Sequence, residues 1–351
     1  MPAAVGIRRQ RARQDGGTGV LEASMEGDRT CVEFDECDAN GFASCRFFAF
    51  DTVASMRVPA YVEQERTSAA LDALEGAVGL CRRFERLLSR TLVGSDVWGV
   101  NRSTGELVEV DFDTWEALRD AKRFSAESEG TFDFTMGGVT CLWDFRKGVS
   151  PDRSELAEAL GHVGWRKIEL FETGGRSGGR RFVRKADALT CVDVGGTAKG
   201  LIADRVCAFL REAGMPCGYV DLGGNIAVFG GKPDGTPWLI GVRDPFGCED
   251  AVAIVALRDG SVVTSGISER SFLRDGALRH HILDPTTGMP VDADLASATL
   301  VAPTSVEADG RSTMIFALGL DRAIRYVEGR DDLEAVLVDV KGNVHVTSGL
   351  L

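Results

Sequence analysis

Apolar and polar positions change their spacing at a pair of glycines in the middle of the chain. Before the pair, Val192 and Val194 flank a polar residue, which is the alternation typical of a strand. After Gly195 and Gly196, apolar residues recur at helical spacing, and Gly214 is a suitable stop. These apolar residues are Ala198, Ile202, Val206, Phe209, Leu210 and Ala213. Residues 190–214 are therefore predicted to form a strand, a glycine turn and a helix.

The start of this predicted helix suits a phosphate group. A glycine turn that leads into a helix leaves backbone N–H groups unpaired at the positive end of the helix dipole. Lys199 adds a cation in the first turn. A turn that only packs against the helix, with Lys199 in solvent, explains the pattern equally well. The spacing matches neither the Rossmann fingerprint nor the P-loop.

The remaining apolar pattern predicts hairpins with a few helices between them. Helical spacing marks residues 61–89, 113–128, 154–161, 306–318 and 321–327, and short β-branched or aromatic runs mark the strands. The runs 45–50 and 53–58 either pair as a hairpin or lie in line. We expect an α+β fold with largely antiparallel sheets and inserted helices, in one domain over residues 44–351. Residues 1–43 lack periodicity, which predicts a flexible N-terminal arm.

Composition narrows the class of partner. The formal net charge of −13 argues against a general nucleic-acid binder and against a surface for anionic lipid. No apolar run reaches the length of a membrane-spanning helix, and the N-terminal arginines precede no apolar stretch, so we expect neither a membrane segment nor a secretory signal. The nine cysteines include no C-x-x-C pair, which is typical of reduced thiols and predicts a cytoplasmic location.

Two short segments near the middle of the C-terminal half add candidate chemistry. A second glycine pair, Gly223 and Gly224, follows a predicted strand and offers another close backbone approach to a ligand. His281 stands at a strand end before the rigid turn at Asp284 and Pro285, where an imidazole could act as a general base. A histidine that is only hydrogen-bonded in the turn is the alternative.

Asp309 and Thr313 form a candidate cation site. Their spacing of four residues places a carboxylate and a hydroxyl on one face of a helix. Together with phosphate oxygens and water, these are the hard oxygen ligands that Mg²⁺ prefers. The alternative is structural: an Asp near a helix start, and a Thr that bonds back to the helix.

These segments, in this order, resemble the ApbE family of FAD:protein FMN transferases. The resemblance extends from about residue 47 to about residue 319, and it implies a T-fold-like domain. It also implies an enzyme that uses FAD and Mg²⁺, transfers FMN to a Thr or Ser hydroxyl of an acceptor protein, and releases AMP. The matching segments are FDFTMG (132–137), DVGGTAKG (193–200), LGG (222–224), WLIGVRDP (238–245), TSG (264–266), HILDPTTG (281–288) and ADGRST (308–313).

The resemblance assigns roles to single positions. Asp309 and Thr313 would bind Mg²⁺ with a backbone carbonyl near Ala198. Lys199 would lie at the pyrophosphate and, with His281 as the base for the acceptor hydroxyl, take part in catalysis. The other positions implied at the FAD site are Thr52, Met136, Asp193, Gly195, Gly196, Gly223, Gly224, Ser265 and Gly266.

The chain departs from the family pattern at three places. Asp221 and Asn225 exchange the acid and the amide around the second glycine pair, Ile267 and Ser268 replace an Asp-Tyr pair, and Gly310 precedes an arginine in the last segment. The first two changes concern rate and acceptor choice. They leave two other functions open: a protein that binds FAD without transfer, and an FAD pyrophosphatase that yields FMN and AMP. The chain contains no acceptor-like segment of its own, so we expect a separate acceptor protein.

Overall fold

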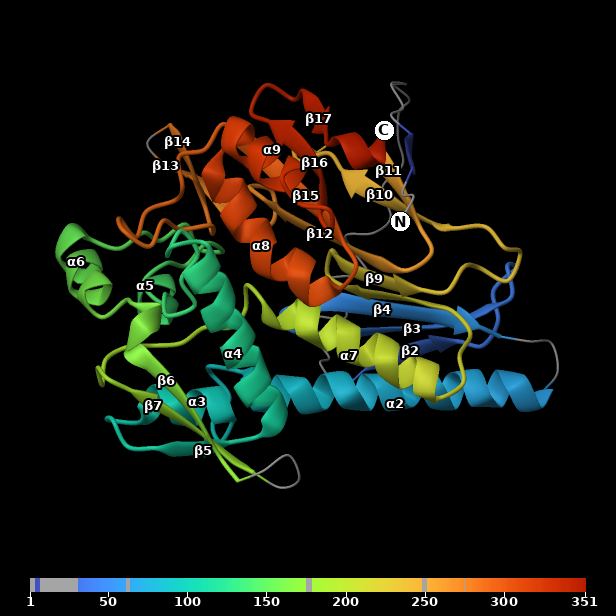
Figure 1. The fold of residues 1–351 in the computed structure, drawn as a ribbon, viewed down its shortest axis with the longest axis horizontal. Helices are drawn as coiled ribbons and strands as arrows, with labels where there is room; N and C mark the ends of the chain where they lie inside the picture. Colours follow the sequence, from blue (N-terminus) through green and yellow to red (C-terminus); the bar gives the residue numbers. More distant parts are fainter. Residues whose placement is uncertain (1–3, 7–30, 61–63, 175–178, 248–250, 275) are drawn as a thin grey trace.

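A nine-stranded antiparallel sheet is the largest element of the computed structural model (Figure 1). The structure describes residues 4–6, 31–60, 64–174, 179–247, 251–274 and 276–351. From one edge to the other the strands are β17 (Val344–Val346), β16 (Glu334–Asp339), β15 (Leu295–Ala302), β12 (Gly260–Gly266), β9 (Asn225–Phe229), β8 (Gly218–Leu222), β4 (Thr52–Pro59), β3 (Phe42–Ala49) and β2 (Val32–Asp35). Every neighbouring pair is antiparallel, which confirms the predicted α+β class.

Three smaller sheets accompany the large one. The first contains β1 (Ala4–Gly6), β11 (Ala251–Leu257) and β10 (Trp238–Arg243), and the second contains β5 (Val108–Val110), β7 (Arg180–Lys185) and β6 (Ile168–Thr173). The third is the hairpin of β13 (Ser271–Arg274) and β14 (Ala277–His280). The runs 45–50 and 53–58, whose arrangement the sequence left open, pair as the hairpin β3–β4.

Helices cover one face of the large sheet. The helix α2 packs against β3, α7 packs against β8 and β9, α8 packs against β12 and β15, and α9 packs against β16 (Figure 1). The helices are α2 (Gln64–Leu88), α3 (Asp96–Arg102), α4 (Phe112–Glu127), α5 (Gly137–Thr140), α6 (Arg153–Gly161), α7 (Ala198–Glu212), α8 (Ser305–Leu318) and α9 (Leu320–Glu328). Within the described residues, no helix has both the length and the apolar content needed to span a membrane.

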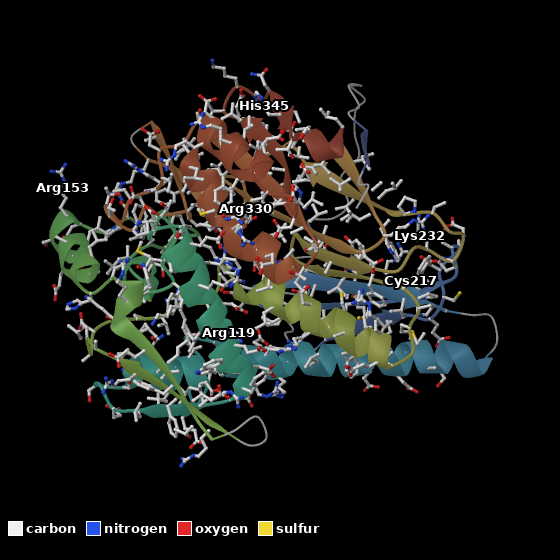
Figure 2. All side chains as sticks on the ribbon, in the orientation of Figure 1. Arg119, Arg153, Cys217, Lys232, Arg330 and His345 are labelled. Carbon is white, nitrogen blue, oxygen red and sulfur yellow. The ribbon has the colours of Figure 1, made fainter. Side chains whose placement is uncertain are left out.

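The sheet separates two apolar cores. One lies under the helices and the other lies between the large sheet and β10–β11, where Trp238, Ile240 and Val242 contribute alternate side chains of β10. All eight residues of β15 are buried because this central strand faces both cores. Side chains such as Arg153, on α6, extend outward from the periphery (Figure 2).

The chain joins the fold earlier than the sequence indicated. Part of the predicted arm, Val32–Asp35, forms the edge strand β2 on β3, and Phe42 already belongs to β3. The short strand β1 pairs with β11. The sequence signal was weak because β2 is an edge strand that is mostly exposed and therefore needs little apolar patterning. Residues 1–3 and 7–30 of the predicted arm lie outside the described residues.

Candidate functional site

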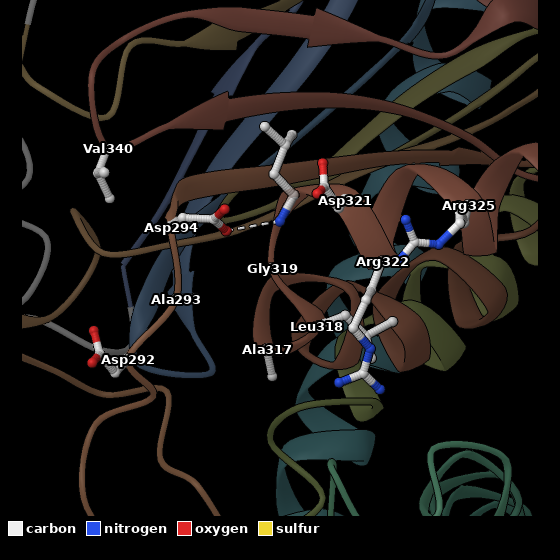
Figure 3. Close-up of a pocket in the computed structure, with 11 residues that line it drawn as sticks. Asp292, Ala293, Asp294, Ala317, Leu318, Gly319, Asp321, Arg322, Arg325 and Val340 are labelled. Atoms are coloured by element: carbon white, nitrogen blue, oxygen red, sulfur yellow. Dashed lines mark hydrogen bonds between the residues drawn. The ribbon is translucent and has the colours of Figure 1, made fainter.

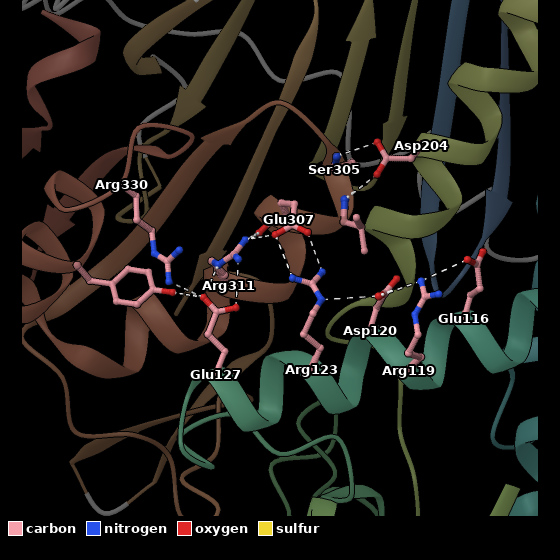
Figure 4. Close-up of polar contacts among 12 residues, drawn as sticks. Glu116, Arg119, Asp120, Arg123, Glu127, Asp204, Ser305, Glu307, Arg311 and Arg330 are labelled. Atoms are coloured by element: carbon pink, nitrogen blue, oxygen red, sulfur yellow. Dashed lines mark hydrogen bonds and ion pairs between the residues drawn. The ribbon is translucent and has the colours of Figure 1, made fainter. Parts of the chain in front are cut away.

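The helices α7 and α8 begin side by side and cap each other. The backbone N–H of Gly200, in the first turn of α7, donates to Oδ2 of Asp309 at 2.8 Å. In return, Asp204 of α7 accepts the N–H groups of Ser305 and Val306 at 2.8 and 2.9 Å (Figure 4). Neither helix has a side-chain cap of its own, so each carboxylate supplies the acceptor that the other helix lacks.

Gly200 makes this close approach possible. A Cβ at this position would lie 2.5 Å from the carbonyl oxygen of Ser305 and 2.7 Å from both Cα of Val306 and Cβ of Asp309. Because two of these atoms belong to the backbone of α8, no rotamer change could relieve the overlap. The last glycine of the segment DVGGTAKG is therefore required where the two helices touch.

Asp309 is buried with only 5% of its surface exposed. Burial raises the pKa of its carboxyl to about 6, against the opposing effects of the Lys199 ammonium, the Gly200 N–H and the Asn225 side chain. The nearby Glu269 raises that pKa further. A buried carboxylate of this kind is stabilised by a cation, and Lys199 already supplies part of that charge.

His281 enters the same site from the end of the hairpin β13–β14. The backbone N–H of His281 donates to the carbonyl of Arg270 at 3.1 Å, and the imidazole Nε2 lies 3.6 Å from a carboxylate oxygen of Glu269. Burial, together with the charges of Arg270, His280 and Lys199, lowers the pKa of the imidazole to about 4. His281 is therefore neutral near pH 7, as a general base must be.

The neighbouring His280 points to the other side of the strand. Its Nε2 lies 3.1 Å from the carbonyl oxygen of Val291, and its ring meets the edge of Phe316 with 5.6 Å between the ring centres. This histidine is part of the packing behind the site. The opposite orientations follow from the alternation of side chains along a strand.

The second glycine pair forms the tight turn of the hairpin β8–β9. Gly223 and Gly224 have φ of +70° and +86°, a conformation that favours glycine. The N–H of Gly224 donates to Asp221 at 2.8 Å, and a Cβ at Gly223 would lie 2.2 Å from Oγ1 of Thr52. Burial raises the pKa of Asp221, and Lys199 again acts against that rise. Thr52 and both glycines therefore lie on the wall of the site that faces Lys199.

The segment before the first glycine pair differs from its prediction. Residues 191–194 form no strand of a sheet; Cys191 makes an isolated parallel bridge to Met136, and the N–H of Asp193 donates to the carbonyl of Phe134 at 2.7 Å. The predicted strand is wrong because the alternation at Val192 and Val194 reflects the burial of both side chains, not a β-ladder. The helix that follows is confirmed as α7.

The first glycine pair is anchored by Asp193. Its Oδ1 accepts the N–H of Gly195 at 2.9 Å, and its Oδ2 pairs with Nε of Arg90 at 3.2 Å. The next glycine, Gly196, faces the ring of Phe132, which would lie 3.0 Å from a Cβ at that position. Asp193 and Met136 therefore position the segment that leads into α7, and neither bonds to Asp309.

Two more expected positions lie at the junction of β12 and α8. The hydroxyls of Ser265 and Ser312 are 2.8 Å apart. Gly266 lies against Ser297, because a Cβ added to Gly266 would lie 3.1 Å from the Cβ of Ser297. Thr313, half-buried, is one helical turn after Asp309, as the spacing predicted.

The oxygen donors around Asp309 suit Mg²⁺ better than a metal that needs several protein ligands. Among the described residues, no group of three His, Cys, Asp or Glu side chains is arranged to hold a metal ion. Mg²⁺ is commonly held by one or two carboxylates together with waters and substrate phosphates. Asp309, the Thr313 hydroxyl and the Ala198 carbonyl, the donors expected from the sequence, would be a set of that kind; Ala198 begins α7, and Thr313 follows Asp309 by one helical turn of α8.

Sequence reasoning assigned no role to two residues of the site. Glu269, which follows the segment TSG, lies beside His281, and burial raises the pKa of its carboxyl against Lys199 and two arginines. Asn225 is buried, accepts the Ser305 hydroxyl at 2.5 Å, and has an Nδ2 without a hydrogen-bond partner among the described residues. The position of Asn225 directly after Gly224 is the only feature of the sequence that indicates a place in the site, and in the family pattern this position is one of the departures.

An ion-pair network holds α4 against α8 behind the site (Figure 4). The guanidinium of Arg311, 7% exposed, donates to both oxygens of Glu127 at 2.9 and 3.1 Å and also pairs with Glu307. Gly310 makes room for the ring of Phe124, which would lie 2.1 Å from a Cβ there. Gly310 and Arg311, which depart from the family pattern, therefore both contact residues of α4.

Two hollows lie on the surface. A hollow of about 750 Å³ at the start of α9 is lined by residues such as Asp294, Arg322 and Val340 and contains none of the expected site residues (Figure 3). A second one, of about 310 Å³, is lined by Asp51, Phe145, Arg146, Ser268, Glu269, Arg270 and Ser271. Because Glu269 contacts His281, the smaller hollow adjoins the site.

Comparison with known proteins agrees with this geometry. The family model described as the ApbE family matches residues 50–337. A relative named FAD:protein FMN transferase from Treponema pallidum is 33% identical over 291 residues, covering 80% of each chain. One of the same name from Klebsiella pneumoniae is 31% identical over 275 residues, covering 77% of this chain and 83% of its own.

Solved structures agree as well. The ApbE protein of Thermotoga maritima superimposes with a TM-score of 0.76 at 30% identity, over 88% of this chain and 97% of its own. The flavin transferase ApbE of Vibrio cholerae shares the fold, with a TM-score of 0.74 at 23% identity, over 88% of this chain and 98% of its own. The chain therefore belongs to the ApbE family.

Proposed function

We propose that this protein transfers the FMN part of FAD to a Ser or Thr hydroxyl of an acceptor protein, releases AMP, and uses Mg²⁺. One observation supports this most directly. The Lys199 ammonium, at the start of α7, lowers the pKa of four titratable groups that come from β8, α8 and the two ends of the hairpin β13–β14. These groups are Asp221, Glu269, His281 and Asp309. A cation, a neutral imidazole and a buried carboxylate converge where a helix start can receive a phosphate.

The start of α7 would hold the pyrophosphate of FAD. Its first N–H groups and the Lys199 ammonium provide positive charge, and the two glycine pairs allow backbone to approach the phosphates closely. This arrangement concentrates the cationic groups at the bond to be broken. It therefore stabilises the charge that develops there during transfer.

His281 would accept the proton of the acceptor hydroxyl. The hydroxyl oxygen attacks the phosphorus on the FMN side, forming a new P–O bond, while the P–O bond of the pyrophosphate breaks and its electron pair leaves with AMP. The proton passes from the hydroxyl to Nε2 of His281, and Glu269 stabilises the imidazolium that results. Because the imidazole is neutral beforehand, no prior deprotonation is needed.

Asp309, Thr313 and the carbonyl of Ala198 would hold Mg²⁺. The ion would neutralise phosphate charge in the transition state. Asp309→Ala should therefore abolish both turnover and the increase in thermal stability that Mg²⁺ confers on the protein, since it removes the carboxylate of the set. Asp332→Ala, in the exposed turn before β16, is a control that should keep both. Full activity of Asp309→Ala would place the metal elsewhere.

The test of the function is a transfer assay. The protein is incubated with FAD and Mg²⁺ in an extract of cells that lack this chain, and flavin fluorescence is read on denaturing gels. Fluorescent acceptor bands that require the enzyme support the transferase. Free FMN and AMP without labelled protein would indicate a pyrophosphatase, and bound but intact FAD would indicate a carrier.

The location of the protein is part of the proposal. The eight cysteines within the described residues form no disulfide, which supports the cytoplasmic location expected from the sequence. Cell fractionation tests this, and recovery of the protein from an oxidising compartment would contradict it.

A further inference from the structure

The hairpin β13–β14 exposes two leucines beside the site. Leu273 and Leu278 are direct cross-strand partners, so both side chains lie on one face, and they are 77% and 39% exposed. Within the described residues, the two strands pair only with each other, which leaves their outer edges available to another strand (Figure 1).

A neighbouring loop supports the hairpin from its opposite face. The ring of Phe272 lies against Gly148, 3.5 Å from where a Cβ would stand, and Arg274 donates to the Ser150 hydroxyl at 2.6 Å. Because side chains alternate along a strand, these contacts leave the face of Leu273 and Leu278 uncovered. We call Leu273 and Leu278 together the hairpin patch. Two exposed apolar side chains on one face form a surface suited to a partner.

Both ends of the hairpin lie in the catalytic site. Glu269 precedes β13 and His281 follows β14, and these two side chains are 3.6 Å apart. His281 is three residues beyond Leu278, a span of at most about 10 Å in an extended chain. The hollow of about 310 Å³ opens at this end of the hairpin. A chain that covers the hairpin patch is therefore within reach of His281.

The charge around the hairpin patch differs in sign from that of the whole chain. The stretches 144–150 and 268–281 contain five basic and three acidic residues, a formal charge of +2 in a chain of −13. The basic residues are Arg146, Lys147, Arg270, Arg274 and Arg279, and the acidic ones are Asp144, Glu269 and Asp275. This local charge favours an acidic partner over a basic one.

We propose that the hairpin patch is the docking surface for the acceptor protein, a proposal that rests on the transfer function proposed above. The occupant is an extended, acidic segment that adds to an edge of the hairpin and places an apolar side chain on Leu273 and Leu278. Its Ser or Thr follows or precedes that side chain by about three residues, so that the hydroxyl reaches His281. The patch thus selects the acceptor, and the α7 start selects FAD.

Labelled peptides test this docking. The first peptide contains one threonine, a leucine about three residues away, and several glutamates. Two matched peptides replace either the leucine by serine or the glutamates by lysines. Fluorescence anisotropy should show that the protein binds the first peptide at least about tenfold more tightly than either matched peptide. No binding, or equal binding of all three, overturns the proposal.

Variants locate the contact. In Leu273→Ser/Leu278→Ser, the preference for the first peptide should be lost and the KM for acceptor should rise about tenfold, with FAD affinity unchanged. Leu239→Ser is the matched control, because Leu239 is 64% exposed on β10 in a different sheet. A double variant that binds and transfers like the parent overturns the docking surface alone. Failure of the parent to label any protein would instead refute the transferase function.

Discussion

Replacing Gly200 by alanine should separate the two helices that carry the site. The added Cβ would be 2.5 Å from the Ser305 oxygen, whereas non-bonded atoms settle at about 3.5 Å or more, so α7 and α8 must move apart by about 1 Å. The bond from the Gly200 N–H to Asp309, now 2.8 Å, would then exceed hydrogen-bonding distance.

The magnitude follows from three contributions to the free energy of unfolding. Overpacking against backbone costs about 1–3 kcal/mol, and loss of the cap from Asp309 costs about 0.5–2 kcal/mol. Alanine in place of glycine within a helix returns about 1 kcal/mol. Gly200→Ala should therefore be less stable than the parent by about 0.5–4 kcal/mol.

Gly79 provides a control of opposite sign. It lies exposed within α2, and a Cβ there would meet no atom within 4 Å. Gly79→Ala should be more stable than the parent by about 0.4–1 kcal/mol. Urea unfolding, followed by tryptophan fluorescence and by circular dichroism, compares the two midpoints at equal slopes. If Gly200→Ala is stabilised to the same degree as Gly79→Ala, the close contact between α7 and α8 is wrong.

Four further predictions concern three side chains. Arg311→Met should destabilise the protein by about 1–3 kcal/mol in urea unfolding, because it removes the buried guanidinium from Glu127 and Glu307 and leaves them only Arg330 and Arg123; a change below about 0.5 kcal/mol would show that the network is not needed for stability. His281→Ala should slow transfer by about 10²–10⁴-fold with little change in FAD affinity, whereas His280→Ala should keep most activity. Because the pKa of His281 is about 4 in the protein without FAD, its ring signal, assigned by comparison with His281→Ala, should titrate near pH 4 in NMR spectra of the protein alone; a midpoint near pH 6.5 would refute this protonation state. The Asp204 carboxyl has a pKa of about 6 in the folded protein and a reference pKa of 3.8, so it ionises at lower pH in the unfolded state than in the folded state. The free energy of unfolding of the parent, relative to that of Asp204→Asn, should therefore fall as the pH rises from about 4 to about 6 and stay level above pH 6. A rise over this interval would contradict the assigned burial.

The chemistry of the site was predictable to the extent that it lies in contiguous segments. The turn at Gly223 and Gly224, and the orientation of His281 opposite to His280, follow from local rules. Glu269 and Asn225 received no role from the sequence, because nothing in their local sequence reports the neighbours that the fold gives them. Gly310 and Arg311 were noted only as departures, since their partners Phe124 and Glu127 are on another helix.

The sequence by itself determined the elements whose signal is local. Helical periodicity placed α4 and α8 within a residue or two, because each helix buries one stripe of side chains. The succession of hairpins determined the ladders β3–β4, β8–β9 and β16–β17, because strands joined by short turns pair with each other. The ordered motifs identified the family and most of the proposed site.

Only the tertiary structure decided how those motifs act together. The bond between Gly200 and Asp309 joins residues 109 positions apart, and those between Asp204 and the start of α8 span 101 and 102 positions. Such contacts depend on how the sheet brings two helix starts together, which no local pattern records. The same applies to the edge strand β2, which has little apolar signal of its own. It also applies to the convergence of Asp221, Glu269, His281 and Asp309 on Lys199, because the fold brings together charges that are distant in the sequence.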